Sequence, residues 1–368
     1  MSPLAYPLLL AHLATLSPAE QQNVCLSPYS LQSAFALVQE GAKGATKDQI
    51  AHTLHTADYV SLPDQPSQSE DAVTFEQANS IWINADYASK IKSSFLKANQ
   101  KRHQAEVTAL PFSADAKQQI NQWCSQKTHG RIPEAISELS SSDVMELINT
   151  LYFKGTWLTS FSPRLTREQD FFTPTLDDDP IRVSMMHNTA RFAYGENETC
   201  QIVELPFIAD YDAGQDQYAM QVILPKEGTT LQQLNQQLAD GQALPELSHV
   251  KVRLSLPKFE IDYSADLIPT LQGMGLTLPF SDAANFSRIS STPLKISTVT
   301  QKTYFKVDEQ GAEAAAVTTI GMMLTSAAPR PEKVYEMTVD HPFLVQLINK
   351  THDTILFLSD INHPNSKQ

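Results

Sequence analysis

The stretch Glu309-Gln310-Gly311-Ala312-Glu313-Ala314-Ala315-Ala316 opens a segment that runs on to Pro331, and this segment decides the fold. In an extended strand, side chains at alternate positions point to opposite faces. One of the two faces would then carry only small, modest or apolar side chains: Ala312, Ala314, Ala316, Thr318, Ile320 and Met322. The segment nevertheless ends in Pro329-Arg330-Pro331, which is unfavourable in a central strand. We therefore predict a strand that has not yet joined a sheet.

Helix is the alternative for the same residues. Alanine-rich runs with flanking acids favour a helix by propensity, and periodicity separates the two states poorly over a run this short. The rest of the chain decides between them. The order of residues 309–316 resembles the hinge of the serpin family, Glu-x-Gly-Thr-Glu-Ala-Ala-Ala, with Ala312 at the threonine position. In that family the hinge begins an exposed reactive-centre loop.

The resemblance covers nearly the whole chain. Residues 144–157 read Val-Met-Glu-Leu-Ile-Asn-Thr-Leu-Tyr-Phe-Lys-Gly-Thr-Trp, a strand pattern in which polar Asn149 interrupts apolar residues. A buried asparagine needs hydrogen-bond partners. The block Asn23–Ser30 resembles the N-terminal serpin signature, and Asp340–Val345 resembles one of the closing strands. Together with the hinge, these blocks identify the chain as a member of the serpin family.

The resemblance also implies a set of site residues. The hinge comprises Glu309, Gly311, Ala312, Glu313, Ala314, Ala315, Ala316 and Thr318. Ser27, Ser30 and Asn149 occupy the positions of the family's shutter, and Trp157 resembles the tryptophan below the point of loop insertion. Gln301 replaces the usual shutter histidine; glutamine can donate and accept hydrogen bonds, but it lacks the pH-dependent charge of histidine. Simpler roles are that both serines cap a helix and that Trp157 is plain core.

The fold implied is of the α+β class, with three β-sheets, about eight helices and an exposed reactive-centre loop at about 309–331. We predict one domain, 1–368, of the prokaryotic type with a shortened helix D region, because Asp58–Thr74 is polar and lacks helical periodicity. Leu294–Val307 is predicted to be the strand that leads into the loop.

Composition restricts the partners. The formal net charge of −14 argues against nucleic acid, heparin-type polyanions and acidic membranes. No apolar run reaches the length of a membrane span, and the monomer is the expected state. Cys25, Cys124 and Cys200 form no metal-type spacing, so each is expected to be a small core side chain. The first sixteen residues lack the features of a signal peptide; the family suggests an extracellular or periplasmic location, and a cytoplasmic one stays open.

Motifs of an enzyme are missing. The sequence contains no G-x-S-x-G, H-E-x-x-H, G-x-G-x-x-G or C-x-x-C. Ser94-Phe95-Leu96-Lys97 fits S-x-x-K, but the companion motifs S-D-N and K-T-G are absent. We therefore expect no catalytic residues, no metal and no cofactor.

The resemblance implies a suicide-substrate inhibitor of serine proteases that forms a covalent acyl complex with its target. Family spacing from Glu309 places the reactive bond at Thr325-Ser326, with Met323-Leu324 and Leu324-Thr325 as alternatives. No Lys or Arg lies between Glu309 and Pro329, which favours elastase-like targets and, second, chymotrypsin-like or subtilisin-like ones. The alternative is a non-inhibitory serpin that acts as a carrier, a chaperone or a plain protease substrate. The small inward residues of the hinge favour inhibition.

Overall fold

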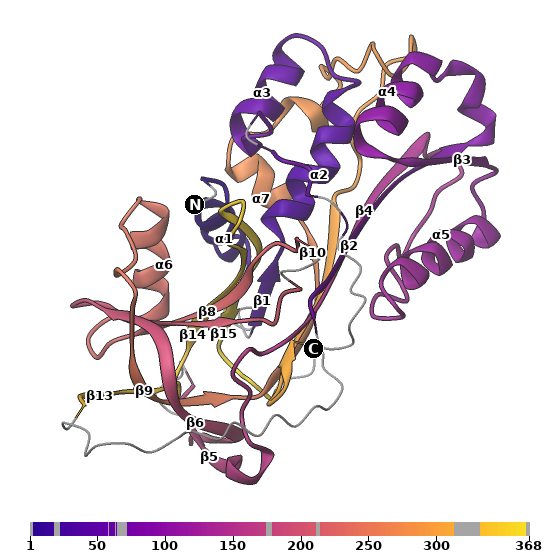
Figure 1. The fold of residues 1–368 in the computed structure, drawn as a ribbon. Helices are drawn as coiled ribbons and strands as arrows, with labels where there is room; N and C mark the ends of the chain where they lie inside the picture. The colour runs from indigo at the N-terminus through magenta and orange to yellow at the C-terminus, as the bar shows by residue number, and fades with distance from the viewer. Residues whose placement is uncertain are drawn as a thin grey trace.

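A computed structural model describes residues 3–17, 23–57, 59–62, 64, 72–173, 179–210, 214–312 and 332–365. Figure 1 shows how the helices and strands of these ranges are arranged. Their order along the chain is α1 (Ala5–Leu13), β1 (Asn23–Leu26), α2 (Pro28–Gln39), α3 (Ala45–Leu54), β2 (Thr74–Asn84), the 3₁₀ helix η1 (Ala85–Lys90), α4 (Ser93–His103), β3 (Glu106–Leu110), α5 (Ala114–Lys127), β4 (Met145–Thr156), η2 (Pro163–Leu165), β5 (Arg167–Phe171), β6 (Ile181–Glu196), β7 (Cys200–Pro206), β8 (Tyr218–Pro225), α6 (Leu231–Ala239), β9 (Ser248–Pro257), β10 (Phe259–Asp266), α7 (Ile268–Gly273), η3 (Leu278–Phe280), β11 (Thr300–Val307), β12 (Gly311–Ala312), β13 (Val334–Thr338), β14 (Phe343–Asn349) and β15 (Thr354–Ile361).

The smaller sheet has six strands in the order β10-β11-β12-β4-β2-β3. The short strand β12 is antiparallel to both of its neighbours, β11 and β4. It follows that β4 and β11 run parallel to each other, and among the described residues only the two of β12 pair with both strands. Along β11 the side chains alternate between buried and partly exposed, as expected for a strand with one face on the core.

The larger sheet has nine strands, in the order β1-β15-β14-β8-β7-β6-β9-β13 with β5 attached to β6. The long strand β6 joins two parts of this sheet, because its first residues pair with β5 and its last residues pair with β7. Strands β8 and β15 are almost entirely buried. The three predicted sheets therefore correspond to the six-stranded sheet and to these two joined parts.

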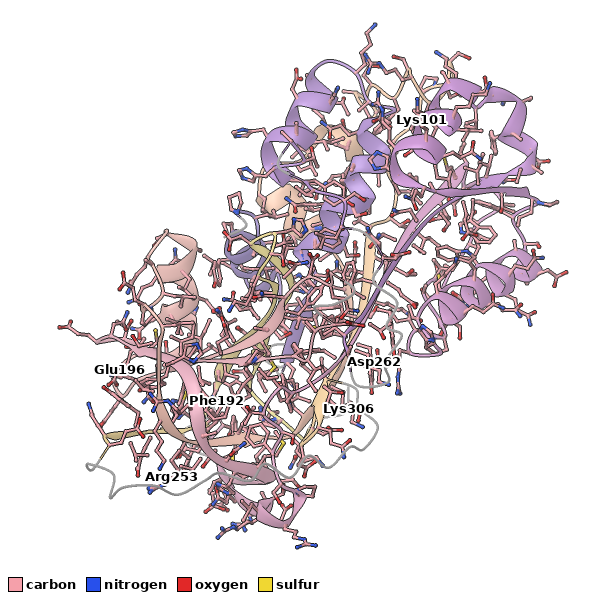
Figure 2. All side chains as sticks on the ribbon, viewed as in Figure 1. Lys101, Phe192, Glu196, Arg253, Asp262 and Lys306 are labelled. Carbon is pink, nitrogen blue, oxygen red and sulfur yellow. The ribbon has the colours of Figure 1, made fainter. Side chains whose placement is uncertain are left out.

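Helices cover both faces of the six-stranded sheet. Helix α2 contacts β4 of the smaller sheet and β15 of the larger one, and α5 contacts β2 and β4 (Figure 1). Figure 2 shows side chains filling the space between these layers. Helix α2 begins where its sequence predicts, since the Ser27 hydroxyl accepts a hydrogen bond from the Ser30 N–H at 3.1 Å and Pro28 occupies the first turn.

One sequence prediction about the strands is wrong. The strand leading to the hinge was predicted at Leu294–Val307, but the structure forms it only over Thr300–Val307. Its neighbour β10 ends at Asp266, the residue paired with Thr300, so residues 294–299 have no strand beside them on that side. On the other side a cavity separates them from β4. A strand pattern without a partner does not form a strand.

The three cysteines are all free and buried, as expected for core side chains. Within the described ranges, no helix is long and apolar enough to cross a membrane.

Candidate functional site

The first part of the site is the turn that joins β11 to β12. The Asp308 N–H donates to the carbonyl oxygen of Gly311 at 3.0 Å, and the Asp308 carboxylate accepts from the Gln310 N–H at 3.0 Å. These two bonds reverse the chain within four residues, so that Ala312 lies beside Val307. The side chain of Ala312 is 2% exposed, and it therefore starts the buried face of a new strand.

Gly311 lets this new strand approach β4. A Cβ atom at position 311 would lie 1.9 Å from the carbonyl oxygen of Gly155, which no side chain can tolerate. Gly155 is the partner of Ala312 in the register, and Thr156 is the partner of Gly311. Glycine at 311 is thus required by a close backbone approach and not by a special φ angle.

Trp157 holds the turn from the opposite strand. Its indole N–H donates to the carbonyl oxygen of Asp308 at 2.9 Å, and its backbone N–H donates to that of Gln310 at 2.7 Å. The ring is 2% exposed and stacks on Phe207 with the ring centres 4.5 Å apart. Trp157 is thus a core residue that also binds the base of the hinge.

Glu309 is buried in the same turn, with 8% of its surface exposed. Its carboxylate lies 2.8 Å from the ammonium of Lys258 and accepts from the Thr166 hydroxyl at 2.8 Å. Burial alone would raise the pKa of Glu309, but these hydrogen bonds outweigh burial and hold the pKa below its ordinary value. Glu309 is therefore ionised at neutral pH and ties the hinge to β10 and β5, whose ends Lys258 and Thr166 adjoin.

The second part of the site lies further down β11, at Gln301. Its side-chain oxygen accepts from the Ser27 N–H at 2.9 Å, and its side-chain N–H donates to the Ser27 carbonyl oxygen, also at 2.9 Å. The Ser27 hydroxyl donates to the Leu356 carbonyl oxygen at 2.7 Å. Gln301 therefore fastens β11 to the start of α2.

Further polar residues surround Asn149 on β4. The Ser30 hydroxyl donates to the side-chain oxygen of Asn149. The Asn149 amide N–H donates to Asn79 on β2 at 2.9 Å and to the Ser33 hydroxyl at 3.2 Å. The Tyr59 hydroxyl extends the network by donating to Ser33 at 3.0 Å. Asn149 thus fastens β4 to α2 and β2.

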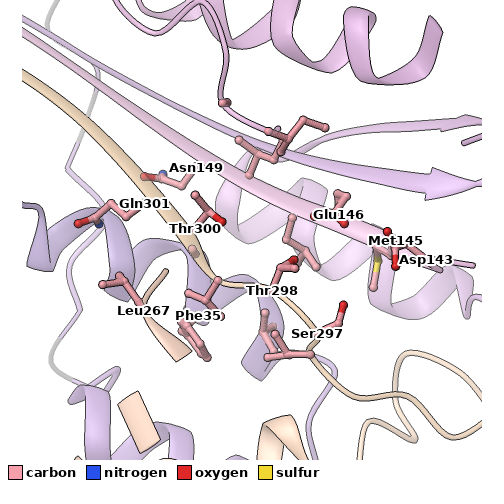
Figure 3. A pocket seen from close by; sticks show the side chains of 18 of the residues that line it. Phe35, Asp143, Met145, Glu146, Asn149, Leu267, Ser297, Thr298, Thr300 and Gln301 are labelled. Atoms are coloured by element: carbon pink, nitrogen blue, oxygen red, sulfur yellow. The ribbon is translucent and has the colours of Figure 1, made fainter. Parts of the chain in front are cut away.

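A cavity of about 670 Å³ lies between β4 and the segment that leads into β11. Residues 145–150 of β4 line one side, residues 293–302 line the other, and residues of α2 and of 132–143 close it above and below. Figure 3 shows Asn149 and Gln301 near one end of the cavity, and Asp143 and Glu146 near the other. No hydrogen bond joins Asn149 to Gln301, although both residues are described, because Gln301 uses its oxygen and its nitrogen on Ser27. The shutter residues predicted from sequence therefore form two pairs, Gln301 with Ser27 and Asn149 with Ser30, which are joined only by the hydrogen bond from the Ser30 N–H to the Ser27 hydroxyl among the described residues.

Several predicted site residues lie outside the described ranges. They are Glu313, Ala314, Ala315, Ala316 and Thr318 of the hinge, and Met323, Leu324, Thr325 and Ser326 around the reactive bond. The roles assigned to them stay predictions.

Sequence reasoning missed four residues that the structure places in the site: Ser33, Asn79, Thr166 and Lys258. Asn79 carried a usable signal, since it is polar within the strand pattern Ala78–Trp82, as Asn149 is within its own. The other three bond to residues far away in the chain, and nothing in their local sequence indicates those partners.

Comparison with known proteins decides the family. The family model described as serpin (serine protease inhibitor) matches residues 8–364. The chain is a serpin. Serpin-Z2A of Triticum aestivum is 32% identical to it, over 93% of this chain and 90% of the wheat protein. The solved structure of Serpin48 from Tenebrio molitor superposes with a TM-score of 0.80 at 26% identity, covering 99% of this chain and 97% of that one.

These findings confirm the predicted family and the predicted fold class. Serpins are in general protease inhibitors and not enzymes. Not every serpin is an inhibitor: human thyroxine-binding globulin, solved with its hormone, superposes with a TM-score of 0.79 at 23% identity, over 99% of this chain and 98% of that one. At that level of identity the likeness shows the shared fold alone.

Proposed function

We propose that this serpin inhibits serine proteases as a suicide substrate, by inserting its cleaved loop into the six-stranded sheet. The observation that best supports this is β12. Its two residues are already antiparallel to both β4 and β11, and these parallel strands separate below it around the cavity. A strand that continued from β12 would find hydrogen-bond partners on both sides.

The register of β12 indicates where an inserted loop would lie. Continued by two residues, it brings position 314 between Phe153 and Phe305. Two further steps bring position 316 between Leu151 and Thr303, and position 318 between Asn149 and Gln301. Burying such a face of small side chains costs little, because Ala314, Ala316 and Thr318 displace little volume. The hydroxyl of Thr318 would meet the two shutter residues that do not bond to each other.

The chemistry belongs to the protease. Its serine attacks the reactive bond and forms an acyl-enzyme, and the freed segment then inserts and carries the attached protease along. Inhibition requires that insertion be faster than hydrolysis of the acyl-enzyme. The serpin contributes the reactive bond, the hinge and the sheet into which the cleaved segment inserts.

The target class follows from the residues around the reactive bond. We place this bond at Thr325-Ser326, with Met323-Leu324 and Leu324-Thr325 as alternatives. Small and apolar side chains at these positions fit elastase-like proteases and, second, chymotrypsin-like or subtilisin-like ones. Trypsin-like proteases require Lys or Arg and should not be inhibited.

A panel of serine proteases tests the proposal. Incubation with an elastase-like protease should give a complex that survives SDS gel electrophoresis, and mass spectrometry should find a released peptide that begins between Met323 and Ala327. Cleavage at the same bond without such a complex would indicate the non-inhibitory alternative. A released peptide that begins elsewhere would overturn the placement of the bond.

A further inference from the structure

Glu146 is a residue of β4 and lines the end of the cavity opposite to Asn149 and Gln301 (Figure 3). In the register of the sheet it pairs with Trp82 of β2, and so the two side chains share the face that α5 covers. Trp82 packs there in a cluster with Phe112, Ile120 and Cys124. Glu146 is thus a carboxyl group at the edge of an apolar cluster. Within the described part of the chain its side-chain carboxyl takes part in no hydrogen bond and no ion pair.

Residues 132–143, which we name the cover segment, line the same cavity as Glu146, and Ile136 and Leu139 of this segment pack against the cluster of Trp82. This segment contains neither helix nor strand. It is held at one end by Asn121 of α5, whose side-chain oxygen accepts from the N–H groups of Ala135 and Ile136 at 2.9 Å. At the other end the Asn84 amide donates to the carbonyl oxygens of Ser141 and Asp143, both at 2.9 Å. A segment with so few backbone bonds can open locally without global unfolding.

None of the described charged groups that line the cavity forms an ion pair with Glu146, so its negative charge would not be neutralised there. The other charged residues that line the cavity are Glu138, Asp143, Lys295 and Lys302. Lys295 pairs with Asp282 at 2.7 Å, and no described ion pair joins Lys302 to Glu146. Two lysines of α5 also have partners: Lys117 pairs with Glu134 of the cover segment at 3.2 Å, and Lys127 pairs with Glu106 of β3 at 2.7 Å.

We propose that Glu146 makes the closure of the cover segment depend on pH: the neutral carboxyl keeps the segment over the cavity, and the ionised carboxylate favours its displacement. Burial, and then the charge of Asp143, raise the pKa of Glu146 to about 7 when the cover is closed. Glu146 is half-buried when the cover is closed; when the segment is displaced, the carboxyl becomes more exposed to water and its pKa returns toward the ordinary value. The open form therefore binds fewer protons, and rising pH between these two pKa values favours it.

Hydrogen–deuterium exchange of the intact protein, without any protease, tests this directly. After correction for the intrinsic rate at each pH, the protection of the amides in 132–143 should fall as pH rises from 5 to 8, by up to about a hundredfold, since each pKa unit corresponds to a factor of ten. In Glu146→Gln the protection should not depend on pH. Glu138→Gln, which changes another acid of the same cavity, is the matched control and should behave like the wild type.

Two results would overturn the proposal: protection that is independent of pH in the wild type, or the same pH dependence in Glu146→Gln. Asp143→Asn provides a second readout, because it should move the transition to lower pH without removing it; an unchanged midpoint would count against the assignment.

A more easily displaced cover would also ease loop entry, and that consequence alone rests on the proposed function. A failure to inhibit proteases would therefore not affect the exchange result. A negative exchange result would likewise not affect the proposed inhibition.

Discussion

The side-chain amide of Gln301 makes the same pair of hydrogen bonds that a residue of a neighbouring strand would make. Its amide donates to and accepts from the backbone of a single residue, Ser27, with both distances at 2.9 Å. The same exchange of two bonds defines a hydrogen-bonded pair in an antiparallel sheet. The histidine usual in the family has no such amide, so this replacement gives β11 an attachment to α2 that does not titrate.

Gln301→Leu should lower the free energy of unfolding by about 1–3 kcal/mol, because it leaves the buried Ser27 N–H without its partner. The Ser27 carbonyl retains the bond from the Leu31 N–H at 3.1 Å, so the loss is confined mainly to the donor. Denaturant unfolding measures the change. The exposed neighbour Thr300→Ala should stay within about 0.5 kcal/mol of the wild type; a similar loss in both variants would contradict the role given to the Gln301 amide.

His12 predicts a dependence of stability on pH. Its ring nitrogens lie 2.8 Å from the Thr270 hydroxyl and 2.6 Å from the Tyr263 hydroxyl, and the side chain is 2% exposed. Burial lowers the pKa of His12 to about 4, whereas the unfolded chain keeps a value near 6.5. The native state therefore holds His12 neutral. Its contribution to stability is full above pH 6.5 and is lost as pH falls toward 4, by about 3 kcal/mol in all.

The comparison of wild type with His12→Gln separates the contribution of His12 from that of the other titratable groups. The difference in unfolding free energy between the two proteins should shrink by about 3 kcal/mol from pH 7 to pH 4. Chemical denaturation at several pH values measures it. A difference that stays constant over that range would show that His12 titrates alike in the folded and unfolded states.

At the scale of elements, β12 is a strand of two residues that determines how the sheet can grow. The turn of Asp308 and the bonds from Trp157 fix its register, and Gly311 permits its close approach to β4. The buried Ala312 sets which positions of a longer strand would face the core. The face predicted from alternation in the sequence and the face set by the structure agree at this residue.

Ala312→Arg tests that face. Ala312 is already buried in the intact sheet, so an arginine there, whose burial without a partner costs several kcal/mol, should displace β12 from the sheet before cleavage. Insertion must then bury the arginine again, and each 1.4 kcal/mol added to the barrier slows insertion about tenfold. The variant should be cleaved at the same bond and at a similar rate, yet release active protease. The number of serpin molecules cleaved per protease inhibited measures the effect.

Ala315→Arg is the matched control, because the alternation places position 315 on the outward face. It should retain most of the inhibition. Equal inhibition by both variants would show that the assignment of faces is wrong, and with it the case for insertion in this register.

The sequence was sufficient for the elements with a strong local pattern. The capped start of α2 at Ser27-Pro28 and the strand around Asn149 were both predicted correctly, because capping and alternation act over a few residues. The strand predicted at 294–299 does not form, because a strand also needs a neighbouring strand to pair with. That neighbouring strand is supplied by distant parts of the chain. The partner of Gln301, 274 residues away, lies beyond any local pattern for the same reason.

At the scale of the whole molecule, the six-stranded sheet is incomplete. In the part of the chain that the structure describes, strands β4 and β11 are joined only through Gly311 and Ala312, and below them the edges of both strands face a cavity of about 670 Å³. An interior of this kind forgoes packing and hydrogen bonds that a further strand would supply. The proposed insertion would supply these contacts, and under that proposal the intact fold is less stable than the cleaved one.

Cleavage within Met322–Ser326 should accordingly raise the melting temperature. The freed segment can pair with β4 and β11 at once, and at about 1 kcal/mol for each net hydrogen bond the gain is on the order of 10 kcal/mol. For a chain of this size such a gain corresponds to a rise on the order of 10–20 °C. Nicking of an ordinary exposed loop leaves stability unchanged or lower, so differential scanning calorimetry of the intact and cleaved proteins distinguishes the two cases. Cleaved Ala312→Arg should show much less of the rise, and equal melting temperatures of intact and cleaved wild type would rule out insertion into this sheet.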